Sequence, residues 1–136
     1  MSSRGPSELT ALLTTAWLYF VIVFSFAFAM GIARGLVVAP RLGETSAVLL
    51  EIPVLLAFSW FIARRLVRKH VFTVWHLVSI GAIAFMLTMI CEAGLADLIR
   101  GQSVAQWAMD LCKPLGLAGL AGQLGFALMP ALVGRQ

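Results

Sequence analysis

The sequence predicts an all-α polytopic membrane protein with four transmembrane helices and a short interfacial helix before the fourth. Three observations lead to this fold class. Hydrophobic residues make up 61% of the 136 residues, charged residues only 12%, and the mean hydropathy is +0.97, values unlike those of water-soluble domains. Long apolar runs recur along the chain, each able to cross a hydrocarbon core of about 30 Å. The cations stand mainly at the ends of these runs, where they act as topology signals.

The first transmembrane helix is predicted over residues 9–33, which contain no charged side chain. Arg34, Pro40 and Gly43 then interrupt the apolar run. Because proline restricts the residue before it, Pro40 is expected to push Ala39 toward an extended conformation. The chain is therefore predicted to turn after the first helix, between residues 34 and 43.

The second transmembrane helix is predicted over residues 44–63, which after Glu44 at the start are apolar apart from Glu51 and small hydroxyl side chains. It is expected to end at the basic cluster of residues 64–69. Pro53 in its interior leaves the carbonyl of Leu49 without its usual donor, a defect that membrane helices tolerate when a neighbour or water satisfies it. A mild kink close to Glu51 is therefore expected.

The third transmembrane helix is predicted over residues 71–98, and a short helix follows over residues 103–112. Ser103 and Gln106 have the S-x-x-Q spacing of a capping box. Apolar residues recur at helical intervals on one face of the short helix, and polar residues lie opposite them. This pattern predicts a helix lying in the membrane interface, with Trp107 at headgroup depth.

The fourth transmembrane helix is predicted over residues 114–133, a stretch without charge whose Pro114 suits the first turn of a helix. Its glycines leave a broad face without side-chain bulk, where another helix can approach closely. The predicted helix-packing residues are Gly116, Gly119, Gly122 and Gly125.

The distribution of cations predicts the orientation of this single domain, which spans residues 1–136. With four crossings, both termini and the second loop share one side, which holds Arg4, Arg64, Arg65, Arg68, Lys69 and Arg135. The other side holds Arg34, Arg41, Arg100 and Lys113. Four of the first six cations fall in one short loop, so both termini are predicted to be cytoplasmic.

A polar site is predicted in the outer half of the bundle. A charged side chain near the centre of a spanning helix costs about 2.5–3.5 kcal/mol, so Glu51 and Glu92 require an explanation. Counted along their predicted helices, Glu51, Glu92 and Gln123 lie roughly 10–12 Å from the same face. Arg34 stands at that face and could pair with either carboxylate. The predicted mouth of the site is formed by Arg41, Asp97 and Lys113.

Two functions of different class are consistent with this site. In a small transporter or channel-like module, Glu51 and Glu92 would bind a cation or shuttle a proton, and Arg34 or Arg41 would screen the entrance. Alternatively, the polar groups form a buried salt-bridge network that fixes helix register. The chain would then be a non-catalytic accessory or assembly subunit that docks through its glycine face. Either function calls for a homo-oligomer or a larger membrane complex, because four helices enclose little volume.

Other chemistries receive little support from the sequence. A membrane enzyme ranks third and no catalytic residue is assigned, because the sequence has no Walker loop, GxGxxG, HExxH or serine elbow. The basic cluster is too short for a nucleic-acid-binding face. His70 and His76 belong to the same end of one helix, whereas bis-histidine haem requires ligands on opposing faces. No metal ligand set and no cofactor is assigned.

Residues 39–60, with the sequence APRLGETSAVLLEIPVLLAFSW, resemble a stretch of a family of small bacterial four-helix inner-membrane proteins. The resemblance implies a bacterial inner-membrane location and supplies no activity. The length, the helix count and an arginine upstream of a helix-two glutamate are also similar to the membrane glutathione-transferase and eicosanoid-enzyme superfamily. However, Val48 stands where that superfamily has an asparagine, and the predicted orientation puts the turn on the opposite side.

Overall fold

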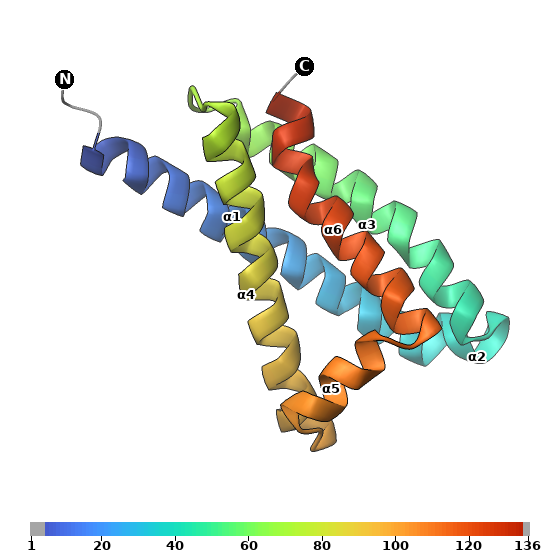
Figure 1. The fold of residues 1–136 in the computed structure, drawn as a ribbon. Helices are drawn as coiled ribbons and strands as arrows, with labels where there is room; N and C mark the ends of the chain where they lie inside the picture. The colour runs from blue at the N-terminus through green and yellow to red at the C-terminus, as the bar shows by residue number, and fades with distance from the viewer. Residues whose placement is uncertain (1–4, 135–136) are drawn as a thin grey trace.

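The computed structural model describes residues 5–134, which form helices joined by short turns without a strand (Figure 1). Four helical segments are long and apolar enough to cross a membrane, which confirms the predicted all-α polytopic fold. The elements are α1 (Gly5–Ala33), the π-helix η1 (Arg34–Val38), α2 (Ala39–Leu42), α3 (Glu44–Val67), α4 (Val74–Arg100), α5 (Val104–Leu111) and α6 (Pro114–Gly134).

The turn after the first helix begins later than predicted. Ala39 has helical backbone angles, φ −61° and ψ −42°, so the expectation that it is extended was wrong. In the π-helical turn the Ala39 N–H bonds to the carbonyl of Arg34, and Pro40 then falls in the first turn of α2, where no N–H is needed. The chain turns only at Gly43, whose φ of 87° favours glycine.

The helix α3 continues past its predicted end to Val67. Two arginines of the basic cluster lie in its last turn, where cations are favourable near the helix C-terminus. The Arg64 guanidinium lies 5.0 Å from the Trp60 ring centroid, and that of Arg65 lies 5.6 Å from Phe61. Each contact joins residues four apart on α3, so both arginines belong to the helix and not to the following loop.

Capping interactions determine where α4 and α5 begin. The backbone N–H of His76 donates to Thr73 Oγ1 at 3.3 Å, so α4 starts at Val74 and not at residue 71. The predicted capping box before α5 is confirmed: Gln106 N–H donates to Ser103 Oγ at 3.2 Å, and Ser103 N–H donates to Gln106 Oε1 at 2.9 Å.

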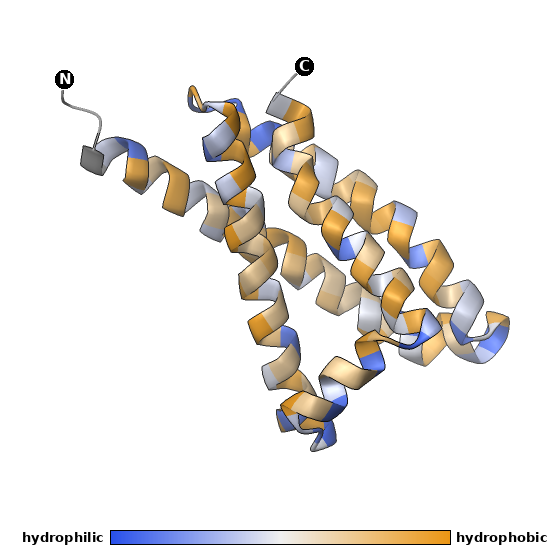
Figure 2. Cartoon of the chain, viewed as in Figure 1, coloured by the Kyte–Doolittle hydropathy of each residue, from blue (hydrophilic) through white to orange (hydrophobic). Residues whose placement is uncertain are grey.

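The helices are arranged so that the two ends of the bundle differ. The start of α1, the α3–α4 loop and the end of α6 lie at one end, which we call the loop end, whereas α2 and α5 lie at the other (Figure 1). Helices α3 and α6 run side by side, and α4 diverges from α6 toward α5. Hydrophilic residues gather mainly at the two ends, with apolar surface between them (Figure 2), as a bilayer requires.

A buried tyrosine joins α1 to α6 in the middle of the bundle. The Tyr19 ring stacks on Phe126 with centroids 4.6 Å apart, and its hydroxyl donates to the Phe126 carbonyl at 2.5 Å. Pro130, four residues later in α6, has no N–H, so the Phe126 carbonyl lacks its intrahelical donor. Tyr19 thus supplies the hydrogen bond that the proline removes.

The glycines of α6 allow close contact with α3 at two of the predicted positions. A Cβ added at Gly122 would lie 3.4 Å from Ile52, and one at Gly125 would lie 2.7 Å from Leu56. A Cβ at Gly119 would meet no atom within 4 Å. The chain's own α3 therefore fills part of the glycine face.

Two further glycines lie directly against backbone. A Cβ at Gly116 would overlap the backbone of α5 at Asp110 and Leu111, so this glycine allows the tight connection between α5 and α6. In α4, a Cβ at Gly81 would overlap the backbone carbonyl of Ala127 in α6. The α4–α6 crossing therefore depends on a glycine that the sequence analysis did not select.

Candidate functional site

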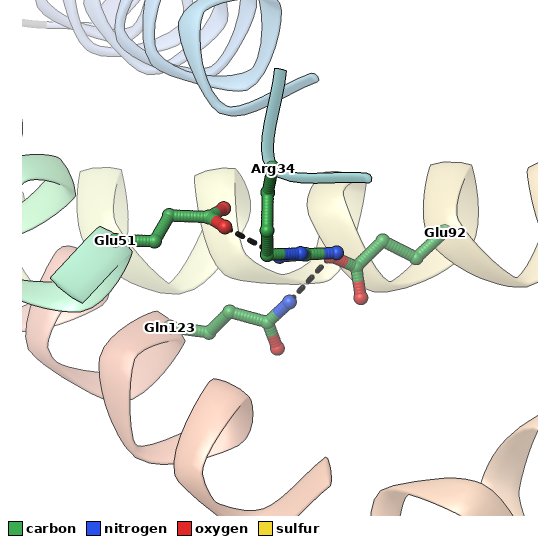
Figure 3. Close-up of polar contacts among 4 residues, drawn as sticks. All are labelled: Arg34, Glu51, Glu92 and Gln123. Carbon is green, nitrogen blue, oxygen red and sulfur yellow. Dashed lines mark hydrogen bonds and ion pairs between the residues drawn. The ribbon is translucent and has the colours of Figure 1, made fainter. Parts of the chain in front are cut away.

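Four polar side chains at membrane depth point toward one another near the α2–α5 end of the bundle (Figure 3). Each comes from a different membrane-spanning segment, and all four are half-buried. They are Arg34 in η1, Glu51 in α3, Glu92 in α4 and Gln123 in α6. The structure thus brings together the four residues that the sequence analysis selected, and the hydrogen bonds divide them into two pairs.

The first pair is an ion pair between Arg34 and Glu51. A guanidinium nitrogen of Arg34 donates to Glu51 Oε2, and the two side chains are 33% and 14% exposed. Arg34 is the first residue of the π-helical turn, whose wider register changes the direction of the side chains that follow α1. The pair therefore joins the C-terminal end of the first span to α3 and neutralises one of the two carboxylates.

The second pair contains a carboxylate without a cation. Gln123 Nε2 donates to Glu92 Oε1 at 2.5 Å. Among the described residues no ion pair within 4.0 Å involves Glu92, whereas Arg34 is already bound to Glu51. If both carboxylates are ionised, the four side chains carry one positive and two negative charges. The charge of the site therefore depends on whether Glu92 holds a proton.

The amide of Gln123 also has unused hydrogen-bonding capacity. Its Oε1 is buried and has no hydrogen-bond partner within the described part of the chain. A carboxylate accepts only, but a protonated carboxyl also donates, and an amide can do either according to which end it presents. Rotation of the amide would let Gln123 donate to an ionised Glu92 or accept from a protonated one. The pair can accommodate both charge states.

The three residues predicted at the mouth of the site form no bonds with the four central side chains within the described residues. They are Arg41, Asp97 and Lys113, and all three are exposed. Lys113 instead pairs with Asp110, Nζ to Oδ1 at 2.9 Å. Gln102 Nε2 donates to Asp110 Oδ2 at 2.7 Å.

These two interactions bond Asp110 of α5 to the residue Gln102 before the helix and to Lys113 after it. Hydrogen bonds from Lys113 and then Gln102 hold the pKa of Asp110 below its ordinary value. The three-residue spacing of Asp110 and Lys113 is a signal that could have predicted their pairing. The partner of Gln102, by contrast, depends on how the chain returns after α4, which sequence spacing does not give.

No protein-family model, curated protein or solved structure matches this chain. The family resemblance of residues 39–60 therefore stays an expectation, and the function has to be inferred from the chemistry of the site.

Proposed function

We propose that this integral membrane protein exchanges a proton or a small cation at Glu92 and thereby takes part in cation or proton translocation. The observation that supports this most directly is that two neighbouring carboxylates have different partners. Glu51 is paired with Arg34, whereas within the described residues Glu92 bonds to the neutral amide of Gln123 and to no cation within 4.0 Å. A proton-handling site needs one carboxylate whose charge can change, held by groups whose charge does not.

Each member of the site has a distinct role in this proposal. Arg34 and Glu51 form an ion pair that holds the end of α1 against α3. Gln123 orients the Glu92 carboxyl and adapts to its charge by rotating its amide. Glu92 carries the exchangeable charge. A cation larger than a proton would use the Glu92 carboxylate and the unpartnered Gln123 Oε1 as oxygen ligands.

The accessory-subunit function is less well supported. It relied on docking through the glycine face of α6, and α3 of the same chain already packs against Gly122 and Gly125. Only Gly119 faces open space among these three positions. A homo-oligomer or a larger complex stays part of the proposal, because the bundle alone encloses little volume for a pathway.

We also propose a bacterial inner-membrane location, which the resemblance of residues 39–60 implies. The cations at the end of α3 and in the α3–α4 loop favour an orientation with both termini in the cytoplasm. Cysteine accessibility in this loop tests the orientation: labelling by an impermeant reagent from the periplasmic side would contradict it.

Flux in proteoliposomes tests the function. The Glu92→Gln variant keeps the shape of the side chain but has no carboxyl group that can exchange a proton. It should therefore fold normally and lose pH-dependent uptake, measured with an enclosed pH-sensitive dye. The control is Glu44→Gln, which removes an exposed carboxylate that is not assigned to the site and should leave flux unchanged. Absence of flux from the parent protein, or equal flux in the Glu92→Gln variant, would rule the proposal out.

A further inference from the structure

An open groove lies at the loop end of the bundle, opposite the polar site. Its walls are the first turns of α1 and the loop between α3 and α4. Its volume is about 550 Å³, and it is lined by Thr10, Thr14 and His70 among others. His76 lines an adjoining part. We propose that this groove binds the phosphate headgroup of an anionic phospholipid.

The groove offers hydrogen-bond donors suited to phosphate oxygens. Thr10 and Thr14 are exposed and contribute hydroxyl groups from successive turns of α1. His76 accepts the Thr73 backbone N–H at Nδ1, at 3.3 Å, so the neutral imidazole carries its hydrogen on Nε2. Nδ1 is engaged in the helix cap, and Nε2 forms no hydrogen bond within the described residues. Nε2–H is therefore the donor that we assign to the ligand.

Two exposed cations stand directly before a residue that lines the groove. Arg68 and Lys69 directly precede His70, are exposed and form no ion pair within the described residues. Glu8 also lines the groove and has an interaction partner of its own. Cations at a membrane surface attract anionic lipids. The local excess of positive charge therefore favours a phospholipid headgroup with a net negative charge over a zwitterionic headgroup.

The apolar surroundings favour a lipid over a soluble phosphate. Leu9 and Leu13 on α1 are exposed. So are Val71, which lines the adjoining part of the groove, and Trp75 in the first turn of α4. Trp75 is 78% exposed, which suits a tryptophan at the headgroup level of a membrane. Acyl chains of a bound phospholipid can lie along these side chains while its phosphate occupies the groove.

Native mass spectrometry of the whole chain in detergent tests this proposal by titration with dioleoyl phosphatidylglycerol and dioleoyl phosphatidylcholine. The parent protein should bind phosphatidylglycerol about tenfold more tightly than phosphatidylcholine. The Thr10→Val/Thr14→Val double variant removes two donors at constant shape and should lose about five- to tenfold in affinity for that lipid. Ser25→Ala, which removes an exposed hydroxyl elsewhere on α1, is its matched control and should bind as the parent does.

A second pair of variants tests the contribution of charge. Arg68→Gln/Lys69→Gln should reduce the preference for phosphatidylglycerol, whereas Arg41→Gln/Arg100→Gln removes equal charge at the other end and should not. Inorganic phosphate should compete only at concentrations far above those of the lipid. Equal binding of the two lipids, or an undiminished preference in the threonine double variant, would overturn the proposal. Competition by phosphate at lipid-like concentrations would do the same, because the site would then be one for free anions.

Discussion

Replacing Tyr19 with phenylalanine removes one oxygen atom and leaves the stacked ring in place. The Phe126 carbonyl then loses its donor, because Pro130 cannot supply one from within α6. Leaving a buried acceptor unpartnered costs about 1–3 kcal/mol, and hydrogen bonds between membrane helices average about 0.6 kcal/mol. We therefore expect Tyr19→Phe to lower the free energy of unfolding by about 1–2 kcal/mol.

A double-mutant cycle separates this hydrogen bond from other effects of the substitution. In a Pro130→Ala background, the alanine N–H restores the bond to Phe126 within the helix, so the hydroxyl becomes redundant. The cost of Tyr19→Phe should then fall below about 0.5 kcal/mol, which gives a coupling energy of about 1 kcal/mol.

Equilibrium unfolding in mixed micelles of mild detergent and dodecyl sulfate measures both values. Trp17→Phe is the matched control, because this neighbouring aromatic is 55% exposed, and it should change stability by less than about 0.5 kcal/mol. An equal cost of Tyr19→Phe in both backgrounds would refute the reasoning, as would a neutral effect in the parent chain.

Three further predictions follow from the packing and the charges. Gly125→Leu should destabilise the protein by about 1–3 kcal/mol through overpacking against α3, whereas Gly119→Leu, which meets open space, should be nearly neutral in the same unfolding assay; equal effects would contradict the assigned contacts. Glu51→Gln should cost about 1–3 kcal/mol because it leaves the Arg34 charge unpaired, less than for a fully buried pair since Arg34 is 33% exposed; a neutral outcome would show that the pair is unimportant. The lowered pKa of Asp110 means that its contribution is present above its ordinary value, near 4, and is lost as the pH falls through the lower folded value. Melting temperatures of the parent and Asp110→Asn should therefore differ slightly at neutral pH and converge at strongly acid pH, and a constant difference would argue against this role.

Local signals in the sequence predicted local structure well. The capping box of Ser103 and Gln106 was predicted because its two hydrogen bonds lie within one turn. The helix after Arg34 was missed because the effect of Pro40 was judged from the residue before it alone, whereas a π-helical turn absorbs the proline.

Contacts between helices were harder to predict than the helices themselves. Counting residues from the helix ends placed Glu51, Glu92 and Gln123 at one depth, and the structure does bring their side chains together. Counting did not show which carboxylate Arg34 would bind, because that depends on the rotation of each helix about its axis. The role of Tyr19 was missed for the same reason, although a lone tyrosine and a proline inside a helix were both visible.

We propose above all that Glu92 exchanges its proton while Arg34 and Glu51 remain an ion pair. Infrared difference spectroscopy of the reconstituted protein measures this directly, because a protonated carboxyl group has a carbonyl band that an ionised one lacks. As the pH is varied near neutrality, where carboxylates of ordinary pKa stay ionised, the parent protein should show such a band that appears and disappears. In this range Glu92→Gln should lack the band while Asp97→Asn retains it. A spectrum in which no carboxyl band changes with pH, or in which the band persists in Glu92→Gln, would contradict the account.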